Sequence, residues 1–123
     1  MYPKKILVVD DEEVIRQLCQ RLLGKLGFDL ILAGTVEAAL STIDQSTLDL
    51  LVTDLKLPDG SGTEIIFHFK NKFQTSGVVV MTGSATPEDR LASCAGLVSS
   101  SLMKPFDKGS FISAVTNALE CRW

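Results

Sequence analysis

Apolar residues are distributed along the chain in two kinds of segment. Five short runs are almost wholly apolar and lie at 5–10, 29–33, 49–53, 77–82 and 97–103. Such runs are typical of strands that a parallel sheet buries on both faces. The last run is the weakest, because Ser99, Ser100 and Ser101 interrupt it. Between the runs, apolar residues recur at the spacing of an amphipathic helix.

This spacing predicts helices at 12–26, after Thr35, around 63–73, from Pro87 to Gly96 and at 107–121. In the first helix the expected inward positions are Val14, Ile15, Leu18, Leu22 and Leu26. Asp11 is a candidate cap for the start of this helix, and Thr35 is one for the second helix. Gly27 is placed to end the first helix. Each predicted strand is therefore followed by a predicted helix.

Repeated alternation of strand and helix implies an α/β fold, in which helices cover both faces of a parallel sheet. Because crossovers between parallel strands are right-handed, we favour a doubly wound, flavodoxin-like sheet of five strands in the order 2-1-3-4-5. In that order the chain reverses direction between the first and third strands, and ligands bind in the crevice that opens there. The length of 123 residues predicts a single domain covering 1–123.

Polar side chains stand where four of the predicted strands end. Asp10 and Asp11 follow the first strand, Asp54 the third, Thr82 the fourth and Lys104 the fifth. The carboxyl ends of parallel strands meet at one edge of a sheet, so we expect these side chains to share one polar pocket. Three carboxylates in one crevice repel each other unless a cation offsets their charge.

This set of groups is suited to phosphoryl transfer. Mg²⁺ takes oxygen ligands, typically one or two carboxylates, and keeps several waters. Lys104 adds a compact positive charge that pairs with an anion, and Thr82 adds a hydroxyl donor. Positioning and charge neutralisation provide most of the catalysis of phosphoryl transfer. No histidine or cysteine ends these strands, so a carboxylate is the predicted attacking group, giving an aspartyl phosphate.

Each of these residues also has a plainer interpretation. Asp10 and Asp11 are common types of helix cap, and Asp54 before a Pro-Asp-Gly turn is a common turn former. Thr82 before a glycine is typical of a turn, and Lys104 is typical of a solvated surface. Only their coincidence at the ends of several strands favours a functional site.

The bulk composition excludes several classes of protein. The net charge is −3 and no basic cluster occurs, so direct nucleic-acid binding is not expected. No apolar run approaches the ~20 residues of a membrane span, and the N-terminus lacks the pattern of a signal peptide. The three cysteines, Cys19, Cys94 and Cys121, form neither a disulfide framework nor a zinc motif. We therefore infer a reducing, cytoplasmic location.

The chain resembles the receiver domain of two-component response regulators over essentially its full length. The matching motifs are Asp10-Asp11, Asp54, Thr82-Gly83 and Lys104-Pro105-Phe106. The resemblance implies that Asp54 is the phosphoacceptor, that Thr82 binds a phosphoryl oxygen and that Lys104 pairs with the phosphoryl group. It also implies that the Lys104–Pro105 peptide bond is cis.

The same resemblance implies a magnesium site. Asp10 and Asp11 would organise Mg²⁺, with Asp11 as the direct ligand. Asp54 and the backbone carbonyl of Lys56 would complete the ligands that the protein supplies.

The function implied is a phosphorylation-dependent signalling switch. A sensor histidine kinase or a phosphotransfer protein would donate the phosphoryl group, and a change of conformation would control an output domain or a downstream protein. The implied output face comprises the fourth helix, the fifth strand and the last helix. Such a domain is not a conventional enzyme, because it catalyses its own phosphorylation and slow dephosphorylation. The sequence leaves homodimer formation open.

The chain departs from the family at Ser101, three residues before the lysine, where receivers commonly have Tyr or Phe. The usual movement of that ring cannot occur with serine, so we hypothesise an altered output surface or a different form of coupling. A degenerate receiver that acts as a phosphorylation-independent interaction module is therefore kept as an alternative. A phosphohydrolase with an aspartyl nucleophile is disfavoured, because such enzymes usually have a second Asp where this chain has Lys56.

Overall fold

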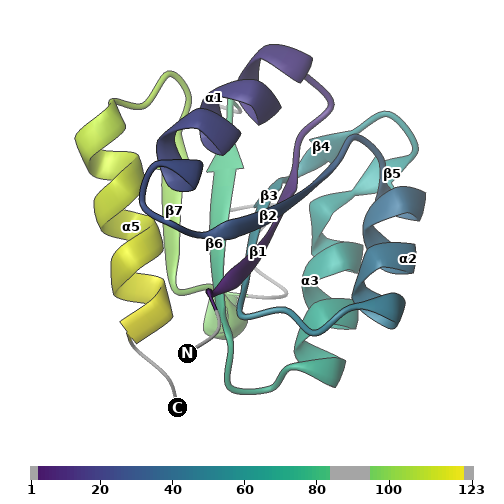
Figure 1. The fold of residues 1–123 in the computed structure, drawn as a ribbon. Coiled ribbons are helices and arrows are strands. Elements are labelled where there is room, and N and C mark those ends of the chain that lie inside the picture. The colour runs from purple at the N-terminus through teal and green to yellow at the C-terminus, as the bar shows by residue number, and fades with distance from the viewer. Residues whose placement is uncertain (1–2, 84–94, 121–123) are drawn as a thin grey trace.

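The computed structural model describes residues 3–83 and 95–120. Within these ranges it shows a five-stranded parallel sheet in the order β2-β1-β3-β6-β7 (Figure 1). The strands are β1 (Lys5–Val9), β2 (Asp29–Ala33), β3 (Leu50–Asp54), β6 (Gly77–Thr82) and β7 (Ser100–Met103). A separate antiparallel hairpin consists of β4 (Lys56–Leu57) and β5 (Gly60–Ser61). Counted along the main sheet, this is the predicted order 2-1-3-4-5, and the predicted fold is confirmed.

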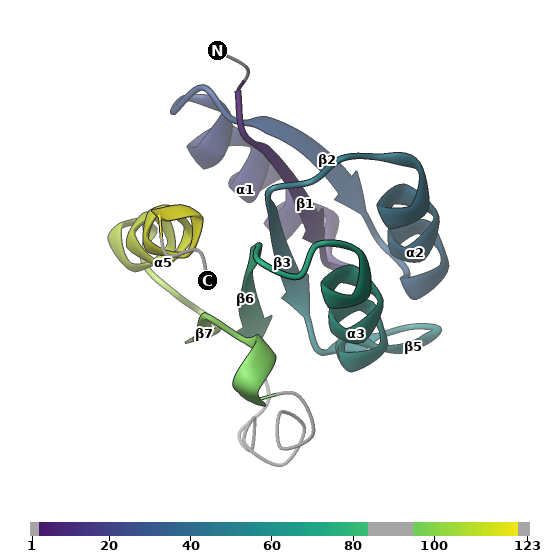
Figure 2. The ribbon, with the colours of Figure 1, turned by 90° about the horizontal axis from the view of Figure 1, so that it is seen from below.

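Helices cover both faces of the sheet, as Figure 2 shows. They are α1 (Glu13–Gly24), α2 (Val36–Gln45), α3 (Gly62–Lys72) and α5 (Lys108–Glu120). One face carries α1 and α5, and the other carries α2 and α3. The helix predicted from Pro87 falls mostly outside the described residues, and its described end is a 3₁₀ turn, Ala95–Leu97. Among the described residues, no helix has the length and apolar character needed to cross a membrane.

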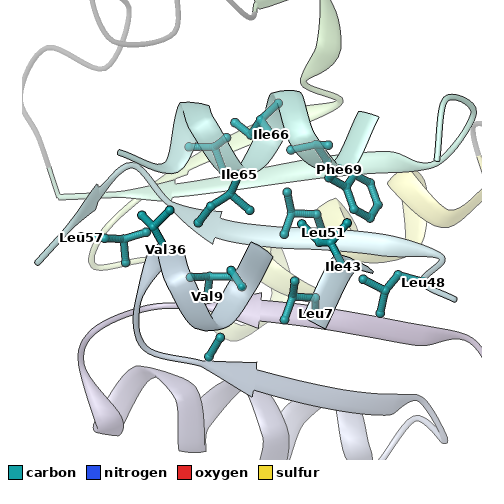
Figure 3. Close-up of a cluster of buried hydrophobic side chains, with 14 of the residues drawn as sticks. Leu7, Val9, Val36, Ile43, Leu48, Leu51, Leu57, Ile65, Ile66 and Phe69 are labelled. Atoms are coloured by element: carbon teal, nitrogen blue, oxygen red, sulfur yellow. The ribbon is translucent and has the colours of Figure 1, made fainter. Parts of the chain in front are cut away.

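The core has two halves, one on each face of the sheet. Successive side chains of a strand point to opposite faces, so Leu7 and Val9 pack toward α2 and α3, whereas Ile6 and Val8 pack toward α1 and α5. Figure 3 shows the first half, whose labelled members are Leu7, Val9, Val36, Ile43, Leu48, Leu51, Leu57, Ile65, Ile66 and Phe69. Each large apolar side chain buried in this way contributes about 1.5–3 kcal/mol. The strands are therefore held by packing on both faces, beneath the residues at their ends.

The face of α1 that is buried against the sheet differs from the predicted one. Its fully buried side chains are Cys19 and Leu23, whereas Val14 is 74% exposed and Leu26 is 48% exposed. The helix also ends earlier, at Gly24, so Leu26 belongs to the turn that follows. Gly27 adopts a φ of +88°, which favours glycine. The chain thus turns at Gly27 as expected, but Val14 and Leu26 were wrongly placed on the inner face.

Strand β7 begins at Ser100, later than the predicted start at residue 97. The reason lies in Ser99, whose amide donates to the carbonyl of Val78 at 2.8 Å. Its hydroxyl accepts from the Val78 amide at 3.2 Å. A serine side chain therefore replaces one backbone partner of β6. The 3₁₀ turn Ala95–Leu97 precedes it, and the regular ladder starts only at Ser100.

Candidate functional site

The residues predicted from the strand ends meet at one edge of the sheet. Its parallel strands end at Val9, Asp54, Thr82 and Met103, so the polar residues that end or follow them lie together. A pocket of about 420 Å³ opens at this edge. It is lined by Asp11, Glu12, Asp54, Lys56, Leu57, Pro58, Thr82, Gly83 and Lys104. Asp10 is fully buried behind the pocket wall.

Lys104 is the centre of the charge arrangement. Its Nζ atom lies 2.5 Å from Asp10 Oδ2, 2.8 Å from Asp54 Oδ2 and 3.5 Å from Glu12 Oε1. The Lys104 side chain is 13% exposed and that of Asp54 9%, so water screens these contacts weakly. Lys104 is therefore held between the ends of β1 and β3.

Burial and pairing shift the pKa values of this group in definite directions. Burial lowers the pKa of Lys104, but the hydrogen bonds to Asp10 and Asp54 outweigh it and raise that pKa above its ordinary value. Burial raises the pKa of Asp10, more than Lys104 and the Glu12 amide lower it. Lys104 is therefore charged at neutral pH, and the ionised Asp10 is held at a cost that a cation can reduce.

The acidic residues form a cluster of oxygen ligands. Carboxylate oxygens of Asp10, Asp11 and Glu12 lie within 4.8 Å of one another. Only oxygens are offered, which fits a hard cation such as Mg²⁺. Asp11 is exposed and lines the pocket, whereas Asp10 is bonded to Lys104 behind it. The donor set of this site is thus consistent with magnesium.

Local contacts fix the segment around Asp10. The Asp10 Oδ1 atom accepts from the Glu12 amide at 2.9 Å, and the Asp10 carbonyl accepts from Arg16 Nη1 at 2.6 Å. Glu12 occupies the N-cap position of α1, and its side chain makes no capping hydrogen bond. The expectation that Asp11 caps α1 is therefore wrong, and its carboxylate lines the pocket instead.

The backbone at Asp54 is fixed by close packing. The hydroxyl of Thr53 donates to the Asp54 carbonyl at 2.8 Å. Gly62 approaches the same carbonyl so closely that a Cβ at this position would overlap it, and would lie 3.0 Å from Leu55 Cα. The Lys56 amide donates to Asp54 Oδ1 at 3.2 Å. Only glycine therefore fits at position 62, where α3 begins.

Thr82 and the Lys104–Pro105 peptide bond are two further predicted features of this region. Thr82 is 3% exposed, and its carbonyl accepts from the Lys104 amide at 2.7 Å. The Lys104–Pro105 peptide bond is cis, as predicted. Ser101 pairs with Val80 across β6 and β7 and is exposed. A small exposed side chain therefore occupies the position where receivers commonly have Tyr or Phe.

Some residues of this site were missed at the level of sequence. Glu12 was the easiest to find, because it extends the acidic run of Asp10 and Asp11. Thr53 and Arg16 gave no sequence signal of a role, because each acts on a backbone carbonyl that only the folded chain brings near. The close approach of Gly62 to the Asp54 carbonyl is likewise visible only in the fold.

A doubly wound sheet with clustered acids at its first and third strand ends, and a lysine at its last, defines the class of phosphorylation receivers. The family model of the response regulator receiver domain matches residues 6–116 of the sequence, and the chain belongs to this family. Its curated homologues are two-component response regulators.

Two such relatives have full-length sequences much longer than this chain. The response regulator protein PilR of Pseudomonas aeruginosa is 30% identical over 122 residues, covering 99% of this chain and 27% of PilR. The phosphate regulon transcriptional regulatory protein PhoB of Escherichia coli is 30% identical over 114 residues, covering 91% of this chain and 50% of PhoB. The chain therefore spans about a quarter to a half of these relatives.

Solved structures agree with this assignment. The CheY-like response regulator receiver domain protein of Methanospirillum hungatei superposes with a TM-score of 0.89 at 26% identity. The superposition covers 97% of this chain and 95% of that one.

Proposed function

We propose that this chain is a phosphorylation-controlled signalling switch in which Asp54 accepts the phosphoryl group. The observation that carries the proposal is the contact of Lys104 Nζ with Asp54 Oδ2 at 2.8 Å, at the wall of an open pocket. A carboxylate oxygen of Asp54 attacks phosphorus, the P–N bond of a phosphohistidine breaks, and an acyl phosphate forms. Lys104 then pairs with the new phosphoryl oxygens, since an ammonium binds an anion as a point charge.

Magnesium would be held by Asp11 and Asp54, by the backbone carbonyl of Lys56, and by Asp10 as an organising acid. When bound, it neutralises charge on the transferring phosphoryl group. The cluster of Asp10, Asp11 and Glu12 supports this assignment, because its net negative charge exceeds what Lys104 offsets. Glu12 lies close enough to join the cluster and was not among the predicted ligands.

Phosphorylation would alter the contacts of the strand ends. A phosphoryl group adds negative charge and acceptor oxygens, and Thr82, which lines the pocket, supplies a hydroxyl donor. Lys104 would lose its contact with the Asp54 carboxylate and form one with the phosphoryl oxygens instead. A two-state rearrangement then biases partner binding.

Receiver domains of two-component systems act with histidine kinases and output domains. We assign this chain a sensor histidine kinase or a phosphotransfer protein as donor. The output face would comprise β7, α5 and the fourth predicted helix, most of which lies outside the described residues. We further propose that 1–123 functions as one receiver domain, and membership of the receiver family supports a cytoplasmic location.

A second candidate is a receiver that acts without phosphorylation, and the exposed Ser101 favours it. Incubation with acetyl phosphate and Mg²⁺, followed by intact mass spectrometry, separates the two. The switch predicts a gain of one phosphoryl group in the wild type and none in Asp54→Asn. No gain in a folded protein that binds Mg²⁺ would favour the phosphorylation-independent module.

A further inference from the structure

The β4–β5 hairpin, which follows Asp54, is hydrogen-bonded to α2 through Asp59 in its turn. Asp59 Oδ1 accepts from the Val36 amide at 2.8 Å, and Asp59 Oδ2 accepts from the Glu37 amide at 3.1 Å. These amides open α2, where backbone donors have no partner within the helix. Thr35 caps the next one, accepting from the Ala38 amide at 3.1 Å. A carboxylate that is distant in sequence thus completes the cap of α2.

The same hairpin carries Lys56, whose carbonyl is a proposed magnesium ligand. Lys56 pairs with Ser61, and Leu57 pairs with Gly60. Leu57 is 7% exposed and belongs to the same core cluster as Val36, beside which it lies in Figure 3. A Cβ on Gly60 would lie 3.3 Å from Val36 Cγ2, so the second arm also lies against α2. The hairpin is therefore packed and hydrogen-bonded to the first turn of this helix.

Asp59 is an exposed side chain outside both core clusters, so its role lies in these two hydrogen bonds. They lower its pKa, because the charged carboxylate is the better acceptor. The positive end of the helix dipole favours the same charge. A neutral or shorter side chain at this position cannot hold both amides equally well.

We propose that Asp59 is a positioning residue for the magnesium site, because it fixes the hairpin that presents the Lys56 carbonyl. This inference rests on the proposed function, in which that carbonyl is a ligand. Its consequence is a coupling between metal binding and the order of the first turn of α2. Coupling between two equilibria is reciprocal. If the hydrogen bonds of Asp59 strengthen Mg²⁺ binding, bound Mg²⁺ must stabilise these hydrogen bonds by the same free energy. Mg²⁺ must therefore slow hydrogen exchange at the amides of Val36 and Glu37.

Calorimetric titration with MgCl₂ and hydrogen exchange of the α2 amides test the inference together. The variants are Asp59→Ala, Asp59→Asn and the control Glu37→Gln. The control removes one negative charge from the same turn. Among the described residues, the Glu37 carboxylate makes no hydrogen bond, so only charge is lost. Comparison with this control separates the effect of losing the two hydrogen bonds of Asp59 from the effect of losing one negative charge.

We expect the Mg²⁺ dissociation constant to rise about tenfold in Asp59→Ala, the lower end of what loss of outer support costs a metal site. The rise should be smaller in Asp59→Asn and absent in Glu37→Gln. Mg²⁺ should slow exchange at Val36 and Glu37 in the wild type but not in Asp59→Ala.

Equal Mg²⁺ affinities in Asp59→Ala and Glu37→Gln, with Mg²⁺-independent exchange in the wild type, would overturn the inference and leave Asp59 as a helix cap only. A folded wild type that binds no Mg²⁺ would overturn the magnesium site itself, and the inference with it. The two failures are therefore distinguishable.

Discussion

Lys104 Nζ lies 2.8 Å from Asp54 Oδ2, although 50 positions of sequence separate the two residues. The same ammonium contacts the fully buried Asp10. One cation therefore offsets two carboxylates at the ends of adjacent strands, with Asp11 and Glu12 close by. Any change of charge at Asp54 must alter the contacts of Lys104, which is the physical basis of a switch at this site.

Lys104→Met keeps most of the aliphatic stem and removes the charge. We expect the free energy of unfolding to fall by about 3 kcal/mol, because loss of one partner leaves the buried Asp10 uncompensated. Urea unfolding without Mg²⁺ measures the loss. In the background of Asp10→Asn the same substitution should cost less than half as much. A Lys104→Met protein as stable as the wild type would contradict the ion pair.

Asp10→Asn should change the pH dependence of stability in a definite direction. Burial raises the folded-state pKa of Asp10 above 3.8. The stability linked to this group is therefore fully present below pH ~3.9, the usual unfolded value, and is lost as pH rises through the folded pKa. Without Mg²⁺, Asp10→Asn should thus be more stable than the wild type at pH 7, and this advantage should shrink toward pH 4. Thermal unfolding of both proteins between pH 4 and pH 7 measures this advantage. An advantage of Asp10→Asn that grows on acidification would contradict a raised folded-state pKa of Asp10.

Mg²⁺ should stabilise the folded protein through Asp11. At ten times the dissociation constant, a ligand bound only by the native state adds about 1.4 kcal/mol. Asp11→Asn should lose most of this gain. Asp29→Asn is the matched control, because Asp29 is an exposed acid at the opposite end of the sheet. Urea unfolding with and without MgCl₂ compares the three proteins, and equal gains in all of them would argue against a site at Asp11.

Gly62→Ala should damage both stability and the acceptor loop. The added methyl group meets the carbonyl of Asp54 and lies 3.0 Å from Leu55 Cα, so a loss of about 1–3 kcal/mol is expected from overpacking. Gly24→Ala is the control, because a Cβ there meets nothing within 4 Å and Gly24 is the last residue of α1. Chemical denaturation of both variants is the measurement. Similar stabilities would show that the contact at Gly62 relaxes easily.

The main sheet was predictable because each buried strand is a continuous apolar run that ends in a polar residue. Parallel pairing then forces Asp10, Asp54, Thr82 and Lys104 to one edge, so their meeting followed from topology alone. The phase of α1 was not predictable, since Val14 and Leu26 fit an apolar stripe as well as Cys19 and Leu23 do. Only the packing of α1 against the sheet distinguishes them.

The supports of the site escaped prediction for a different reason. Asp59 stands in the Pro-Asp-Gly turn after β3 and carried no prediction of its own, yet it accepts from two amides of α2 that lie 23 and 22 positions earlier. Such contacts depend on the exact path of the hairpin, which the apolar pattern does not encode. The shortened β7 is similar, because Ser99 replaces a backbone acceptor with its own hydroxyl.

The most direct test of the central claim is to locate the phosphoryl group. The protein is incubated with acetyl phosphate and Mg²⁺, reduced with borohydride, digested and analysed by mass spectrometry. Borohydride converts an aspartyl phosphate to homoserine, so the account predicts homoserine at position 54, dependent on Mg²⁺ and absent in Asp54→Asn. Homoserine at Asp10 or Asp11 instead, or an equal yield from Asp54→Asn, would contradict the assignment of Asp54 as the phosphoacceptor.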